Sequence, residues 1–97
     1  MPVYAQNVPR YNVPAHCKQI ASFGGNYSEM LYGTCMDQEQ GSYDALKPTW
    51  PHLPSTMRDH CNEIASFGGP GSYMLLKTCV DQELESARAN ANKGFHY

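Results

Sequence analysis

Histidine and acidic side chains recur at two places in this chain, and their types would suit metal binding. In each place a histidine precedes a cysteine, and an Asp-Gln-Glu run follows the next cysteine; equivalent residues of the two places are 44 positions apart. Imidazole and carboxylate groups are ligands for zinc, copper and other first-row metals. The candidate ligands are His16, Asp37, Glu39, His60, Asp81 and Glu83. Two or three ligands per place do not close a site unless the two places, or two chains, share them.

A structural pairing explains the same residues without a metal. If the two cysteine-bearing segments of each copy are antiparallel helices, His16 lies near Glu39 and His60 lies near Glu83. Polar groups at the rim of a core commonly pair with each other in this way. We therefore predict no cofactor, and a metal-binding or metal-sensing protein that holds zinc or copper is the alternative.

The four cysteines have a spacing that is typical of structural disulfides. Cys17 and Cys35 are 18 positions apart, and so are Cys61 and Cys79. Four cysteines allow three pairings, and pairing within each copy respects the duplication most simply. Zinc sites and thiol-disulfide oxidoreductases usually place two cysteines two to four residues apart. We predict the disulfides Cys17–Cys35 and Cys61–Cys79, with a thiol-disulfide redox protein as a second alternative.

These residues belong to an internal repeat. The run His16–Gln40 aligns without a gap on His60–Leu84, with 16 of 25 positions identical. Such repeats are supersecondary units that bury their apolar faces against each other. The duplication predicts two similar units in tandem.

Helix signals within each unit predict a hairpin of two helices. The first helix begins near Val13 and ends at Gly24, since glycine readily adopts the left-handed conformation that ends helices. Ser28 caps the next helix, which Pro48 ends. The inner apolar stripe is predicted to contain Cys17, Ile20, Ala21, Met30, Leu31 and Cys35, with Ile64, Met74 and Leu75 in the second copy.

The second copy repeats these signals. Ser55 caps a helix that runs to about Phe67, and Ser72 begins a last helix that runs to about Asn92. We predict an all-helical fold of four helices in two tandem hairpins, packed about an approximate two-fold axis. Its parts are an extended arm (1–12), a first hairpin (13–47), a Pro/Trp linker (48–54), a second hairpin (55–94) and a tail (95–97).

Aromatic residues are the candidates for a binding surface. Trp50, the only tryptophan, lies between prolines and is predicted to fill the seam between the hairpins. The alternative is that Trp50, together with Tyr27 and Tyr73, forms a binding surface. The mean hydropathy of -0.55 predicts no large apolar face, so a partner surface is expected to contain tyrosines.

Composition excludes several classes of partner. The net charge is -2 and no block of Lys or Arg occurs, so nucleic acid is not a predicted partner. No apolar run is long enough to cross a membrane. No nucleophile motif surrounds any serine, and the glycine-rich turns lack the lysine of a phosphate loop. We predict that the protein is not an enzyme and that its partner is another protein, with a homodimer as one form.

Disulfides predict an oxidising compartment, so the protein is expected to be periplasmic or secreted. The start Met1-Pro2-Val3-Tyr4 has neither the basic residues nor the apolar segment of a signal peptide. We expect that a native signal peptide was removed.

The repeated motif His-Cys-x-x-Ile-Ala-Ser-Phe-Gly-Gly, followed by Ser-x-Met-Leu-x-x-Thr-Cys-x-Asp-Gln-Glu, resembles that of small exported bacterial proteins of unassigned function. These proteins carry the same duplicated two-cysteine helical hairpin, and the resemblance extends from Val13 to near Ala91. It implies a periplasmic or secreted setting and brings no catalytic residue. The function predicted from the whole sequence is a non-catalytic, disulfide-stapled interaction or scaffold module.

Overall fold

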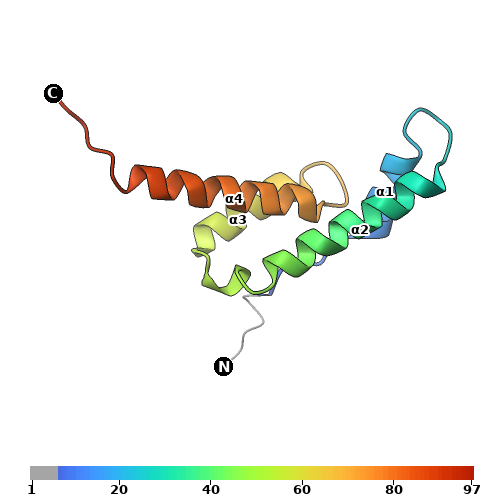
Figure 1. The fold of residues 1–97 in the computed structure, drawn as a ribbon, viewed down its shortest axis with the longest axis horizontal. Helices are drawn as coiled ribbons and strands as arrows, with labels where there is room; N and C mark the ends of the chain where they lie inside the picture. Colours follow the sequence, from blue (N-terminus) through green and yellow to red (C-terminus); the bar gives the residue numbers. More distant parts are fainter. Residues whose placement is uncertain (1–6) are drawn as a thin grey trace.

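A computed structural model describes residues 7–97, and within this range the chain forms four α-helices and no β-strand (Figure 1). The elements are α1 (Val13–Ala21), α2 (Glu29–Leu46), the short 3-10 helix η2 (Trp50–His52), α3 (Ser55–Ser66) and α4 (Tyr73–Asn90). The predicted all-helical fold is confirmed. Across this part of the chain no helix is long and apolar enough to cross a membrane.

Serine side chains begin the second helix of each hairpin, as the sequence predicts. Ser28 Oγ accepts a hydrogen bond from the Leu31 N–H at 3.1 Å, and Ser72 Oγ accepts one from the Leu75 N–H at 3.3 Å. Each cap satisfies an amide that has no partner within the helix. Ser55 differs from the prediction, because it is the first residue of α3 and Pro54 occupies the cap position without a side-chain hydrogen bond.

Each hairpin is closed by one disulfide. Cys17 of α1 is bonded to Cys35 of α2, and Cys61 of α3 is bonded to Cys79 of α4. The Cα atoms are 5.5 Å apart in both bonds, which is a usual distance for a disulfide. Both predicted disulfides are confirmed.

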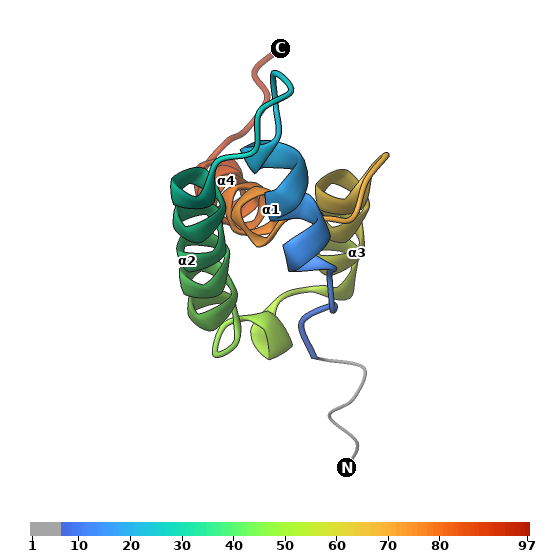
Figure 2. The same cartoon turned by 90° about the vertical axis from the view of Figure 1, so that its right-hand side faces the viewer.

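The two hairpins meet through their second helices. Helix α1 packs on α2, α3 packs on α4, and α2 packs on α4 (Figures 1 and 2). The radius of gyration is 16.1 Å, whereas a compact domain of this length has a value of about 12–13 Å. The molecule is therefore elongated, and much of each hairpin surface is left uncovered.

The apolar core lies in the seam and in the second hairpin. Trp50 is only 3% exposed and belongs to one buried cluster with Leu46 at the end of α2 and Leu76 and Val80 of α4. This position confirms that Trp50 fills the seam. The first hairpin contributes little to the cluster besides Leu46, so it depends more heavily on its disulfide.

The part of the N-terminal arm that the structure describes lies against the second hairpin. Val8 is buried, and the Tyr11 ring stacks on the Tyr73 ring with centroids 4.7 Å apart. The Tyr11 N–H donates to the Tyr73 hydroxyl at 2.8 Å. Residues 1–6, which complete the predicted arm, lie outside the described residues.

Docking of the arm depends on Gly71. Its φ is +97°, and a Cβ added there would lie 2.6 Å from two carbons of the Tyr11 ring. Gly68 also has a positive φ, of +71°, but nothing lies near its missing side chain. We expect Gly71→Ala to lower the free energy of unfolding by about 3 kcal/mol, because left-handed backbone strain adds to overpacking. Gly68→Ala should lower the free energy of unfolding by only about 1 kcal/mol, because it adds backbone strain without overpacking.

Urea unfolding followed by Trp50 fluorescence measures both glycine variants. Equal losses in Gly71→Ala and Gly68→Ala would show that the arm does not occupy this position in solution.

Candidate interaction surface

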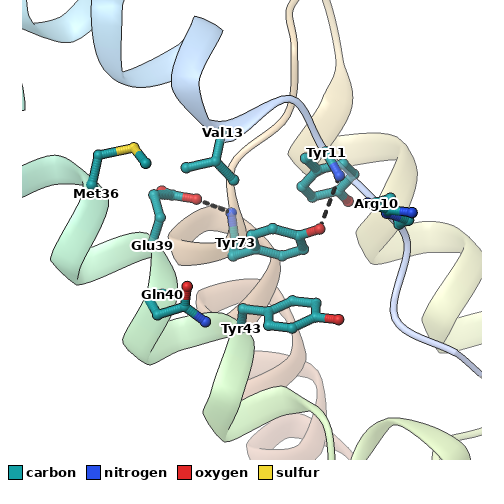
Figure 3. A pocket seen from close by; sticks show the side chains of 8 residues that line it. All are labelled: Arg10, Tyr11, Val13, Met36, Glu39, Gln40, Tyr43 and Tyr73. Carbon is teal, nitrogen blue, oxygen red and sulfur yellow. Dashed lines mark hydrogen bonds between the residues drawn. The ribbon is translucent and has the colours of Figure 1, made fainter.

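Glu39 of α2 joins the two hairpins through the start of α4. Its side chain is fully buried, and its carboxylate accepts a hydrogen bond from Ser72 Oγ at 2.7 Å. It also accepts one from the Tyr73 N–H at 2.6 Å (Figure 3). The Met74 N–H is 3.5 Å from the same carboxylate. A helix N-terminus offers unpaired amides and a partial positive charge, so a carboxylate is well suited to this position.

The predicted histidine–glutamate pairs are present in both hairpins, but their surroundings differ. Nε2 of His16 lies 3.7 Å from Oε2 of Glu39, and Nε2 of His60 lies 3.8 Å from Oε2 of Glu83. The Glu39 side chain is fully buried, whereas the Glu83 side chain is 43% exposed. Identical residues therefore have a covered environment in the first copy and an open one in the second.

The contact between the two hairpins is not symmetric. A two-fold axis would bring Glu83 to Ser28 in the way that Glu39 meets Ser72. Instead, among the described residues Ser28 caps its own helix, and Glu83 lies beside His60. The predicted two-fold packing is wrong, because the start of the second hairpin's long helix rests on the side of the first hairpin. The arrangement is head to tail.

Within residues 7–97, the structure brings together at most two of the predicted metal ligands in each hairpin. Asp81 pairs with Lys77 at 2.8 Å, and Asp37 is exposed. Throughout residues 7–97, no three His, Cys, Asp or Glu side chains gather around one point. The cysteines are not available as ligands, because all four form disulfides.

A hollow of about 290 Å³ lies at the junction, and aromatic rings make up much of its lining (Figure 3). Its lining residues are Arg10, Tyr11, Val13, Met36, Glu39, Gln40, Tyr43 and Tyr73. Burial raises the pKa of Tyr11 to about 12, and the Tyr11 hydroxyl donates to Asn62 Oδ1 at 2.6 Å. Burial also raises the pKa of Tyr73. Both phenols are therefore protonated near neutral pH, and the hollow is a structural junction in which these groups and Glu39 already have partners.

Exposed apolar residues form the most unusual feature of the surface. Four bulky apolar residues of each hairpin are identical in the two copies, and all eight are exposed. They are Ile20, Phe23, Met30 and Leu31 in the first copy, and Ile64, Phe67, Met74 and Leu75 in the second. We call each set of four a tip patch. Phe23 and Phe67, in the turns, are 91% and 87% exposed.

The tip patches correct two predictions from the sequence. Six of their residues were expected in the buried stripe, but all six are at least 41% exposed, even Ile20, Leu31 and Met74, which line a groove between the two hairpins. The low mean hydropathy also predicted no apolar face, because averaging over polar helices hides a local cluster. The signal that could have revealed it is a phenylalanine kept before Gly-Gly in both turns, where a helix core does not require one.

The aromatic binding surface is also corrected. Trp50 and Tyr73 are 3% and 5% exposed, so both belong to the core. Tyr73 stacks on Tyr11 and contacts Tyr43 edge-on, and this arrangement leaves no face for a partner. Tyr27 alone among the three is exposed, at the turn of the first hairpin.

In comparisons with models of protein families, with curated proteins and with solved structures, no match to this chain was found.

Proposed function

We propose that this protein is a non-catalytic interaction or scaffold module that presents the same apolar surface twice. The observation that supports this proposal is the pair of tip patches. Ile64 and Phe67 line one hollow, as do Ile20 and Leu31, and exposed apolar residues that lie together often mark an interaction surface. Because the residues are identical in both hairpins while their neighbours differ, a shared binding role accounts for them better than core packing does.

The proposed setting is an oxidising compartment, periplasmic or extracellular. Both disulfides support it, since such bonds persist where thiols are not kept reduced. Cys17 and Cys61 are fully buried, and Cys35 and Cys79 are nearly so. Catalytic disulfides need an accessible sulfur, so burial favours a structural role for these four residues.

Site-specific cross-linking tests the interaction role. We would place p-benzoylphenylalanine at Phe23 or at Phe67 in the cells that make the protein, and irradiate them. The control is the same residue at His52, an exposed position of the linker. Adducts of defined mass should form at both turn positions and not at His52. Equal yields at all three positions would contradict a specific surface at the tips.

A further inference from the structure

We propose that the partner of one of these surfaces is a second copy of this chain, docked head to tail. This inference rests on the proposed interaction role. The start of α2 in one copy would bind the side of the second hairpin in the next copy. The contact would repeat the one that already joins the two hairpins within the chain.

The internal contact supplies the template. Met74, in the first turn of α4, forms one wall of a groove whose other walls belong to the first hairpin. The first-hairpin residues that line this groove are His16, Ile20, Leu31, Thr34, Cys35 and Gln38. Glu39 completes this receiving face by binding Ser72 and the Tyr73 amide.

The receiving face is present a second time and is open. All six groove residues and the glutamate are identical 44 positions later, on the second hairpin. There, the Glu83 side chain is 43% exposed, whereas the Glu39 side chain is fully buried, and the partner of Glu83 within residues 7–97 is His60. Glu83 can therefore accept hydrogen bonds from a helix start that comes from another molecule.

The inserting end is also present a second time and is open. Ser28 and Met30 of α2 correspond to Ser72 and Met74 of α4. Met30 is 78% exposed, whereas Met74, at the wall of the groove, is 41% exposed. The amides that Glu39 binds belong to the backbone, so the start of α2 offers the same donors whatever its side chains are. Each surface therefore has a complement on another copy.

Unlike residues make the expected contact between copies weaker than the internal one. Tyr43 and Leu46, which seal the internal seam, are replaced by Ala87 and Asn90 in the second copy. Tyr73 is replaced by Glu29, which brings a negative charge toward Glu83. We therefore expect reversible association that depends on protein concentration.

The geometry determines the kind of assembly. A head-to-tail contact uses different surfaces on the two molecules, so it leaves one free surface of each kind and extends into chains or rings. In Figure 1 the α1–α2 turn lies at one end of the molecule and α4 extends toward the other. The inserting and receiving surfaces are therefore separate on each copy.

Mixing two single variants tests this arrangement. Met30→Glu damages only the inserting end, and Ile64→Glu damages only the receiving face. In sedimentation velocity, the wild type should increase in average mass with concentration, and each variant alone should remain a monomer of 10.8 kDa. An equimolar mixture should form a dimer and nothing larger, because one intact contact remains. Phe95→Glu, an exposed apolar site in the tail, should behave like the wild type.

Several results would overturn the second-copy proposal. These are a wild type that is monomeric at all concentrations, a variant that still self-associates, or a mixture that stays monomeric. If circular dichroism shows that Ile64→Glu is not folded, Glu83→Lys on the exposed Glu83 replaces it. Monomeric protein whose turn positions still form specific adducts would reject the second copy and leave the interaction role standing.

Discussion

Replacing Glu39 with glutamine is expected to lower the free energy of unfolding by about 3 kcal/mol, whereas Glu83→Gln should change it by less than about 0.5 kcal/mol. The two residues occupy the same place in the repeat, and each lies beside a histidine. Only Glu39 is buried and bound to the start of another helix. The glutamine side chain keeps one oxygen acceptor, but its NH2 group replaces the other oxygen and faces a donor. Buried polar groups that the carboxylate accepted from are then left without partners.

Urea unfolding at neutral pH measures the Glu39 effect, with Trp50 fluorescence as the probe of the seam. The pair of variants is a matched control, because chemistry, helix position and the neighbouring histidine are the same. Similar losses in the two variants would mean that the head-to-tail junction does not contribute to stability.

Local structure could be predicted from the sequence because its signals are local. Ser28 and Ser72 are caps whose effect depends on the next three residues, and the glycines after Phe23 and Phe67 stop a helix wherever the chain goes next. The disulfides followed from the same logic, since two antiparallel helices with cysteines equidistant from the turn bring the sulfur atoms together. These features need no knowledge of how the hairpins meet.

The way in which the hairpins meet could not be predicted from the repeat. Identical residues suggest equal environments, yet Glu39 is covered by α4 and Glu83 is open. The difference arises because two units joined in tandem have one contact between them and two free ends. Repetition alone does not distinguish a two-fold pair from a head-to-tail pair, and only the second arrangement leaves complementary surfaces free.

Residues that differ between the copies indicated the junction more clearly than those that match. Tyr27 of the first copy corresponds to Gly71, and Glu29 corresponds to Tyr73. Both changes lie where the arm docks, since Tyr11 stacks on Tyr73 and leaves no room for a Cβ at Gly71. When one copy of a repeat has both a glycine and an aromatic residue that the other copy lacks, the difference indicates that another segment packs there.

Removing the two disulfides one at a time is expected to have unequal structural effects. Each bond closes a loop of 18 residues, and in the chain-entropy model each contributes about 3 kcal/mol. That is a large share of the 5–15 kcal/mol that stabilises a typical small domain. The difference lies in what else holds each hairpin together.

The first disulfide is the main tether of α1. Helix α1 packs chiefly on α2, and the residues that it buries are Cys17 and Ala21. In the Cys17→Ser, Cys35→Ser double variant, we expect α1 to detach while the rest of the fold remains. The Cys61–Cys79 bond lies instead within the core cluster, beside Leu76 and Val80. The Cys61→Ser, Cys79→Ser variant should therefore lose the whole cooperative fold more readily.

Hydrogen exchange with mass spectrometry distinguishes these two outcomes. Without the first disulfide, peptides that cover α1 should exchange rapidly, while those of α3 and α4 keep their protection, because local opening needs only the contacts of one helix to break. Without the second disulfide, protection should fall throughout the described helices, since the same residues seal both the second hairpin and the seam. Uniform loss of protection in the first variant would show that α1 is part of the cooperative core, and that the exposed first hairpin is held by more than its disulfide and its junction with α4.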